Sequence, residues 1–127
     1  PDPALIRAEH SAMQFAFSEA MSLLSYAERP TAFLCLGTRI LSGALQAIRH
    51  GGYSLPQDVS VISIGDTDLS QLFSPTITSL SWDLEVMGTC AAQLALKSLD
   101  REAQPPLNDR IVIKTQLILR ESCAPPG

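Results

Sequence analysis

The fold is indicated by residues 30–66, which read PTAFLCLGTRILSGALQAIRHGGYSLPQDVSVISIGD. The runs 31–36 (TAFLCL) and 59–64 (VSVISI) are short and mostly apolar, which is typical of strands buried on both faces of a parallel sheet. Between them, one apolar helical face is formed by Ile40, Leu41, Ala44, Leu45 and Ile48. Gly51 and Gly52 end this helix, because glycine tolerates the left-handed conformation that follows a helix. The stretch therefore predicts a strand, a crossover helix and a parallel strand.

The flanking sequence continues this alternation. Ser11 and Gln14 have the spacing of a capping box, and an apolar helical face follows them to residue 27. On the other side, residues 77–81 predict a third strand, Asp83 a helix cap, and residues 84–101 a helix. Alternating apolar and polar residues over 111–120 predict a longer strand with one face open to water. The order predicts an α/β fold with an open, mostly parallel sheet flanked by helices.

Composition narrows the classes of function. The chain has 127 residues, which fits one domain. Charged residues make up 17%, below the roughly 25% of ordinary domains, so part of the surface is expected to be covered. The net charge is −4 and no basic stripe is present, which argues against direct DNA binding by this chain. No apolar run reaches the ~18 residues that span a bilayer, so no membrane partner is expected.

The sequence has no pattern typical of catalysis. Cys35, Cys90 and Cys123 lack metal-like spacing and suggest neither a disulfide framework nor a metal site, which favours a reducing, cytoplasmic setting. No nucleophile elbow, P-loop or zinc-protease motif occurs. We therefore expect no enzyme activity, no catalytic residues, no cofactor and no metal.

The strand ends are the places to look for a ligand, since open α/β sheets bind ligands at the carboxyl ends of their strands. Three such ends carry Gly37-Thr38, Gly65-Asp66-Thr67-Asp68 and Ser81-Trp82-Asp83. Thr38 is expected to cap the following helix. Residues 65–68 are predicted to form a turn that satisfies backbone amides, with metal binding as the alternative.

Several other side chains have two possible roles, one in ligand or partner binding and one in the fold. Trp82 would either stack on a flat ligand or cover the edge of the core or a partner domain. His10 would face a cleft or water. Leu69, Leu72 and Phe73 would belong to the core or form an association patch.

Several stretches together carry a resemblance. Residues 30–56 and 57–66, then SPTITSL (74–80) and LILRESC (117–123), with DPALI (2–6) at the start, resemble the LacI/GalR family of bacterial transcription regulators in order and spacing. The similarity spans essentially the whole chain. It implies an effector domain like the periplasmic sugar-binding proteins, with two α/β lobes and a ligand cleft between them. It also implies that operator DNA is bound only by an N-terminal headpiece that this chain lacks.

The resemblance implies a division of the chain. Residues 1–127 would be the C-terminal portion of the effector-binding and dimerisation domain, with 1–82 mainly its C-terminal lobe. Residues 83–110 would be a helix and loop that pack on an N-terminal lobe absent here, and 111–127 a returning strand and tail.

The resemblance also implies site residues. The effector-contacting positions match His10, Gly37, Thr38, Gly65, Asp66 and Trp82. The family usually has Asn-Asp where Gly37 and Thr38 stand, and two acidic or amide residues where Gly65 and Asp66 stand. Ligand contacts would therefore rely on backbone groups, Asp66 and Trp82. The family's dimer surface matches Ile40, Leu41, Leu45, Leu69, Leu72 and Phe73, and a two-fold interface would be self-complementary.

The function expected from this resemblance is the effector-sensing and dimerisation part of a LacI-type regulator, whose small-molecule effector modulates DNA binding. A solute-binding protein of a transport system with the same fold is the alternative. A fragment of an α/β enzyme is a third hypothesis.

Overall fold

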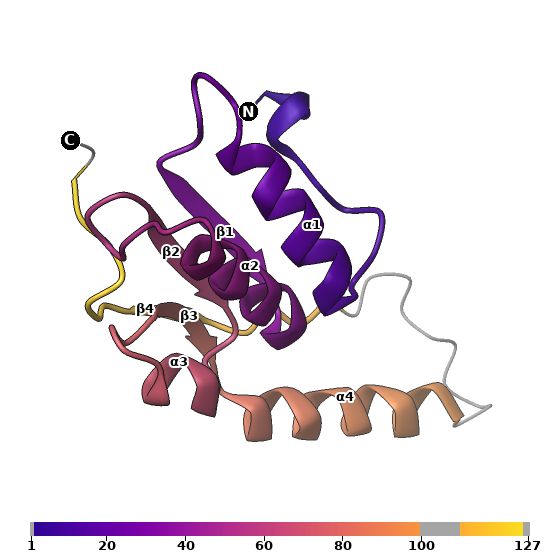
Figure 1. Ribbon diagram of the computed structural model, residues 1–127. Coiled ribbons are helices and arrows are strands. Elements are labelled where there is room, and N and C mark those ends of the chain that lie inside the picture. Colours follow the sequence, from indigo (N-terminus) through magenta and orange to yellow (C-terminus); the bar gives the residue numbers. More distant parts are fainter. Residues whose placement is uncertain (1, 100–109, 126–127) are drawn as a thin grey trace. The chain divides into compact units, whose positions relative to one another are not determined.

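The computed structural model describes residues 2–99 and 110–125. Its elements alternate as predicted (Figure 1). They are η1 (Pro3–Leu5), α1 (Met13–Leu24), β1 (Ala32–Leu36), α2 (Thr38–His50), β2 (Ser60–Ile64), α3 (Asp68–Leu72), β3 (Thr78–Trp82), α4 (Leu84–Leu99) and β4 (Thr115–Ile118). The expected α/β fold with an open, mostly parallel sheet is confirmed. Within the described residues, no helix is long and apolar enough to cross a membrane.

The four strands lie in the order β1-β2-β3-β4. β1, β2 and β3 run parallel, and Leu36 is in register with Ile64, which is in register with Leu80. The hydrogen bonding continues one residue past the first two strands. The Gly37 N–H donates to the Ile64 carbonyl at 3.3 Å, and the Gly65 N–H donates to the Leu80 carbonyl at 2.9 Å. The carboxyl ends of the three strands therefore lie at one edge of the sheet.

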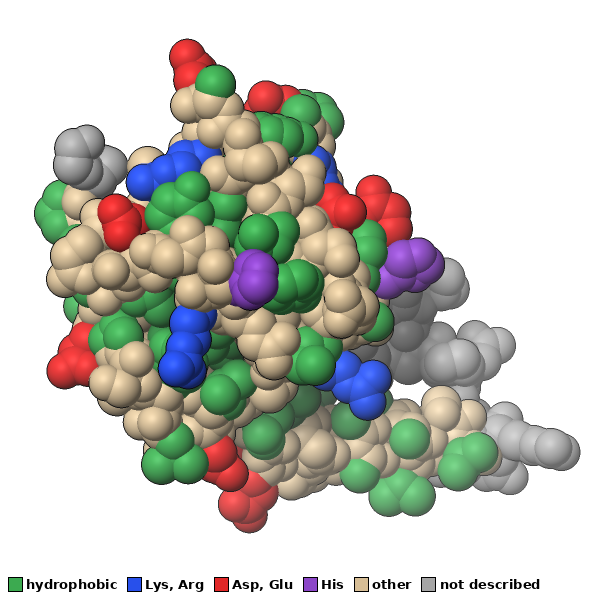
Figure 2. All heavy atoms as spheres, viewed as in Figure 1, with side chains coloured by type: hydrophobic (Ala, Val, Ile, Leu, Met, Phe, Trp, Pro, Cys, Tyr) green, Lys and Arg blue, Asp and Glu red, His purple; other side chains and the backbone are tan. Residues whose placement is uncertain are grey.

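The chain divides into two compact units, Pro1–Ser81 with Leu117–Gly127, and Trp82–Gln116. The second unit contains α4, which has no buried residue. Its large apolar side chains are exposed to solvent (Figure 2), namely Leu84, Val86, Met87, Leu96 and Leu99. The predicted cap of this helix is confirmed, because the Asp83 carboxylate accepts a hydrogen bond from the Val86 N–H at 2.9 Å.

The core of the first unit lies between α1, α2 and one face of the sheet. Leu41, Ile48, Val59, Val61 and Ile77 are fully buried there. The two helices approach each other closely at Gly43. A Cβ placed on Gly43 would lie 2.7 Å from the Ala16 Cβ and 2.8 Å from the Phe17 nitrogen, and closer still to the Met13 carbonyl oxygen. The close contact of α1 with α2 therefore requires a residue without a side chain at Gly43.

The segment after β4 is hydrogen-bonded to the two central strands of the sheet. Ser122 is fully buried, and its carbonyl accepts a hydrogen bond from the Val61 N–H at 2.9 Å. The Ser122 hydroxyl donates to the Val61 carbonyl at 2.6 Å and accepts from the Thr78 N–H at 2.8 Å. One serine thus bonds to both central strands.

Arg120 adds an ion pair to this attachment. Its Nη1 lies 2.7 Å from Asp66 Oδ1 and its Nη2 lies 2.9 Å from Oδ2, and both side chains are largely buried. Nη1 also donates to the Ile77 carbonyl at 2.7 Å. The hydrogen bond from Arg120 is the main reason that the pKa of Asp66 is lowered.

Two predicted helix caps are corrected. α1 begins at Met13 with Ala12 in the cap position, so Ser11 lies one residue too far upstream to bond to the first turn. α2 has Gly37 in the cap position with φ at 90°, a conformation that threonine rarely adopts. Thr38 is therefore the first helical residue and not the cap. The predicted end of this helix is confirmed, since Gly52 has φ at 77°.

Two strand predictions are also corrected. The strand expected over 111–120 covers only Thr115–Ile118, because an alternating pattern does not by itself supply a partner along its whole length. β1 was expected to be buried on both faces, but Leu34 and Leu36 are 60% and 67% exposed. Their face of the strand has no covering layer in the described structure.

Replacing Gly43 with alanine is expected to lower the free energy of unfolding by about 1–3 kcal/mol, because the added methyl would force α1 and α2 apart. Urea denaturation followed by circular dichroism measures this. Gly88→Ala is the matched control, since Gly88 lies in α4 with open space beside it. It should be neutral or stabilising by up to about 1 kcal/mol. Equal effects of the two substitutions would contradict the packing role of Gly43.

Asp66→Asn is expected to cost about 1–3 kcal/mol at pH 7, because it removes a charge-assisted, largely buried hydrogen-bonded pair. Since the folded-state pKa of Asp66 is lowered, its contribution is present above the ordinary pKa of Asp and is lost as the pH falls through the folded-state pKa. The variant should therefore lose less stability than the natural chain between about pH 5 and pH 2, as measured by urea unfolding.

Two other carboxylates, Glu121 and Glu19, serve as controls for the Asp66→Asn measurement. The pKa of Glu121 is also lowered, by bonds from Thr76, so part of the acid sensitivity should remain in Asp66→Asn. Glu19→Gln breaks the more exposed pair with Arg7 and should change the free energy of unfolding much less than Asp66→Asn does, because solvent screens exposed ion pairs. If Asp66→Asn lost as much unfolding free energy at low pH as the natural chain, the pair with Arg120 would not stabilise the fold.

Candidate functional site

The structure brings two of the predicted ligand-binding strand ends next to each other. Gly37 and Thr38 follow β1, and Gly65 and Asp66 follow the neighbouring β2. The hydrogen bond from the Gly37 N–H to the last residue of β2 joins the two ends directly. These four residues thus belong to one edge of the sheet, where open α/β sheets bind their ligands.

Both strand-end glycines have a backbone conformation that favours glycine. Gly37 has φ at 90° and Gly65 has φ at 101°. A side chain at either position would be strained, so an asparagine or aspartate could not replace them without cost. A Cβ placed on Gly37 would have no other atom within 4 Å, so the space beside its backbone is open.

A shallow cavity of about 440 Å³, largely open to solvent, lies in this space. It is lined by Ser11, Leu36, Gly37, Thr38, Arg39 and Ile40. The cavity lies at the N-terminus of α2, where no side chain caps the helix. The first N–H groups of a helix have no partner within it, and they favour the oxygen atoms of a ligand. The site can therefore bind polar ligand atoms through the backbone.

Asp66 has a structural role, because both of its carboxylate oxygens accept hydrogen bonds from Arg120. Gln71 approaches the same carboxylate at 3.5 Å. Arg120 was not among the predicted site residues, although it lies in the family-like stretch 117–123. Its position 54 residues after Asp66 gave no local signal for the pair.

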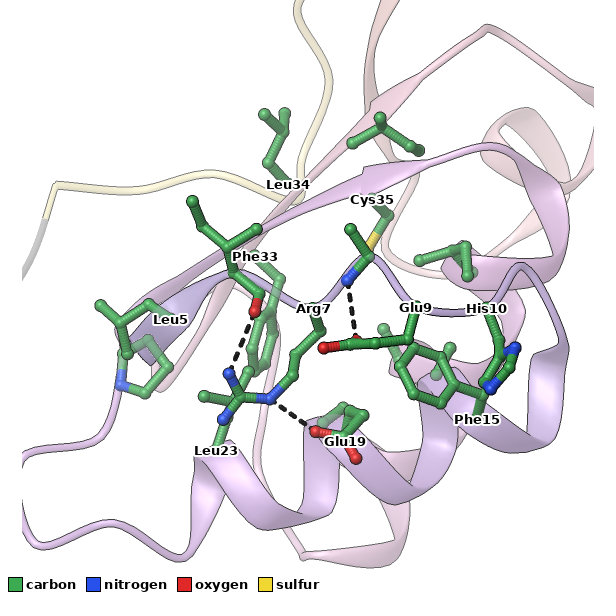
Figure 3. Close-up of a pocket in the computed structure, with 18 of the residues that line it drawn as sticks. Leu5, Arg7, Glu9, His10, Phe15, Glu19, Leu23, Phe33, Leu34 and Cys35 are labelled. Atoms are coloured by element: carbon green, nitrogen blue, oxygen red, sulfur yellow. Dashed lines mark hydrogen bonds and ion pairs between the residues drawn. The ribbon is translucent and has the colours of Figure 1, made fainter. Parts of the chain in front are cut away.

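His10 lies beside a second, larger cavity of about 860 Å³ (Figure 3). Its ring packs edge-on against Phe15, with the ring centroids 5.2 Å apart. The two cavities share Ser11, Leu36 and Ile40 as lining residues. His10 thus adjoins the strand-end site without lining its smaller cavity.

The larger cavity is lined by the N-terminal segment, α1, β1 and two residues of α2, Ile40 and Ala44. Figure 3 shows Leu5, Arg7 and Glu9 from the N-terminal segment, with side chains of α1 and of β1 around the same space. Arg7 forms an ion pair with Glu19 of α1. Cys35 also lines the cavity, and burial raises the pKa of its thiol to about 12. The thiol is therefore neutral at physiological pH and a poor nucleophile.

Trp82 is the last residue of β3 and is half-buried. Its indole Nε1 is buried and has no hydrogen-bond partner among the described residues. Such a donor is unusual, because buried indole N–H groups normally find an acceptor.

The predicted dimer surface is only partly available. Leu41 and Leu45 are buried in the core, with 0% and 4% exposure, so they have no area to offer to a second chain. This burial corrects the predicted set. Ile40, Leu69 and Phe73 are partly buried against the core, and Leu72 is 84% exposed.

The backbone groups at the strand ends are suited to binding a ligand. Across residues 2–99 and 110–125, no three histidine, cysteine or acidic side chains come together as a metal site. Residues 65–68 were predicted to form a turn that satisfies backbone amides. Among the described residues, the Asp66 carboxylate instead accepts hydrogen bonds from the side chains of Arg120 and Gln71, which corrects that prediction.

The sequence and the fold of this chain are similar to those of known proteins. The model of the periplasmic binding protein-like domain matches residues 3–123. The ribose operon repressor of Haemophilus influenzae is 34% identical over 80% of this chain, but the match covers only 30% of that repressor. The lactose operon repressor of Rhizobium radiobacter is 26% identical over 87% of this chain and 96% of that protein.

Solved structures show the same relationship. A LacI family transcriptional regulator from Bifidobacterium animalis is 29% identical, with a TM-score of 0.78, over 91% of this chain and 42% of that one. A LacI family regulator from Arthrobacter in complex with lactose is 26% identical, with a TM-score of 0.74, over 89% and 42% of the two chains.

These relatives are transcriptional regulators rather than enzymes, in agreement with the predicted lack of catalysis. The chain spans about 40% of the length of the solved relatives. It belongs to the periplasmic-binding-protein-like effector domains of LacI/GalR-family transcriptional regulators, of which it forms a part.

Proposed function

We propose that this chain is the effector-sensing and self-associating part of a LacI-type transcriptional regulator. The observation that carries the proposal is the 440 Å³ cavity against Gly37 and Thr38, at the carboxyl end of β1 and the N-terminus of α2. Binding of a small molecule there would modulate DNA binding by a headpiece outside this chain. The bacterial repressors among its relatives favour this function, and a cytoplasmic location, over a transport role.

The chemistry of the cavity favours a small ligand that carries hydroxyl groups. The unpaired N–H groups at the start of α2 donate hydrogen bonds, and the carbonyl and hydroxyl oxygens around them accept. Glycine at residues 37 and 65 lets a ligand approach the backbone closely. The structure of the related Arthrobacter regulator holds lactose, which is a ligand of this class. Trp82 stays a predicted ligand contact, now with an unpaired indole N–H.

The self-association surface is proposed to centre on Leu72. This side chain is 84% exposed, and Leu69 and Phe73 extend the apolar surface toward the core. Apolar side chains gathered on one short exposed segment are typical of an association site. In a two-fold dimer, Leu72 would meet the same segment of the partner chain.

Calorimetric titration of the full chain with ribose, lactose and arabinose tests the ligand site. We expect saturable binding of at least one of them. Gly37→Ala should weaken that binding about tenfold, or ~1.4 kcal/mol, because the methyl enters the open space and strains the backbone at the cavity.

Gly52→Ala is the matched control for this titration. Gly52 also has a positive φ, with open space beside it, but it does not line the cavity. The two variants should lose similar stability, and only Gly37→Ala should lose affinity. Equal affinity losses, or no binding of any of the three sugars, would contradict a sugar site at Gly37.

Light scattering over a range of concentrations tests the association surface. We expect the natural chain to be dimeric and Leu72→Arg to be monomeric, because a charge placed in an apolar interface must be desolvated. Leu119→Arg is the matched control, since Leu119 is 75% exposed and lies outside the proposed surface. A monomeric natural chain at high concentration would refute this part of the proposal.

A further inference from the structure

The solvent-facing side of α2 carries positive charge that no described residue neutralises. The helix contains Arg39, Arg49 and His50 and no acidic residue. Both arginines are exposed, and within residues 2–99 and 110–125 neither of them forms an ion pair. α2 therefore presents an unpaired basic surface in a chain whose net charge is −4.

The two arginines differ in how their own helix affects them. Arg49 lies in the last turn of α2, where the partial negative charge of the helix end stabilises a cation. Arg39 is the second residue of the helix, where the partial positive charge of the N-terminus destabilises a cation. Arg39 is therefore the side chain that would gain more from a carboxylate supplied by another chain.

α3 carries the opposite charge next to the exposed Leu72. Asp68 is the first residue of α3, it is exposed, and it forms no ion pair with a described residue. Leu72 follows four residues later, so the two side chains lie on one face of this helical turn. The surface around Leu72 thus has an apolar centre and a carboxylate at its border, which is the usual arrangement of a protein interface.

The parallel sheet places the two charges at the same edge and on the same face. Leu36 ends β1 and is in register with Ile64, which ends β2, and Arg39 and Asp68 follow these two residues closely. Right-handed crossovers along the strand order β1-β2-β3 put α2 and α3 on one face of the sheet (Figure 1). Within one chain, however, Arg39 and Asp68 do not pair with each other.

We propose that, in the dimer of this chain, Arg39 of each copy forms an ion pair with Asp68 of the other copy. In a two-fold interface each contact occurs twice, so a chain that carries both charges supplies two equivalent pairs, one on either side of Leu72. Because both charges lie at the same edge of the sheet, they meet when the two-fold axis runs along the strands.

These pairs would select a second copy of this chain as the partner. A surface with the wrong sign of charge at either position would be repelled, and such repulsion contributes more to specificity than to affinity. The inference rests on the self-association proposed above. It adds the residues that determine which chain is accepted.

Charge reversal followed by mixing tests the proposal with the full chain in the absence of sugars. Asp68→Arg alone places two arginine–arginine contacts in the dimer, and Arg39→Asp alone places two aspartate–aspartate contacts. Each variant should have a dimer dissociation constant about a hundredfold above that of the natural chain, because like charges across an interface repel. Light scattering over a range of concentrations measures this constant.

An equimolar mixture of the two variants should dimerise again. In the mixed dimer the two introduced charges face each other and the two natural charges face each other, so both contacts join opposite signs. Native mass spectrometry identifies the mixed dimer by its mass. Asp68→Lys with Arg39→Glu is an independent second pair, which replaces the first if circular dichroism shows that either variant is unfolded.

Arg49→Asp is the matched control, since it makes the same change at the other exposed arginine of α2. It should dimerise like the natural chain and should not restore dimerisation of Asp68→Arg. Added salt should weaken the natural dimer, because the ion pairs at the border of the interface are screened.

Three results would overturn the proposal. The first is a natural dimer whose dissociation constant is unchanged by both charge reversals. The second is a mixture of Asp68→Arg and Arg39→Asp that stays monomeric, or a mixture with Arg49→Asp that dimerises in its place. The third is a natural chain that is monomeric at every concentration, which alone would also refute the self-association itself.

Discussion

The parallel hydrogen bonding of β1, β2 and β3 is the constraint on which the rest of this structure depends. Parallel neighbours cannot be joined by tight turns, so each needs a crossover, which α2 and the segment with α3 provide. The same constraint places the ends of all three strands at one edge of the sheet. The cavity at Gly37 and Thr38 lies there because of this arrangement and not because of any single side chain.

The fold could largely be predicted from the sequence because its signals are local. Apolar runs and helical spacing placed the strands and helices of residues 30–99 within one or two residues. The helix caps were less predictable, since a shift of one residue separates Ser11 from Ala12 and Thr38 from Gly37. The pair of Asp66 and Arg120 had no local signal, because it joins residues that only the folded sheet brings together.

The candidate site was predictable in position but less so in chemistry. The predicted strand ends identified Gly37, Thr38, Gly65 and Asp66 as site residues. What each of these residues contacts depends on the three-dimensional structure. Asp66 is held by Arg120, and the two glycines have positive φ values that side chains would strain. Leu41 and Leu45 illustrate the same limit, because one apolar helical face can serve a core or an interface with the same spacing. Their burial assigns them to the core.

Leu36, the last residue of β1, connects the two cavities. An apolar run such as 31–36 predicts burial on both faces, and the structure supplies cover for only one. Ser11, Leu36 and Ile40 line both the smaller and the larger cavity. A group that fills the larger cavity would contact these residues and would therefore alter the wall of the smaller cavity. Occupation of the two cavities would then be physically coupled through the last residue of β1.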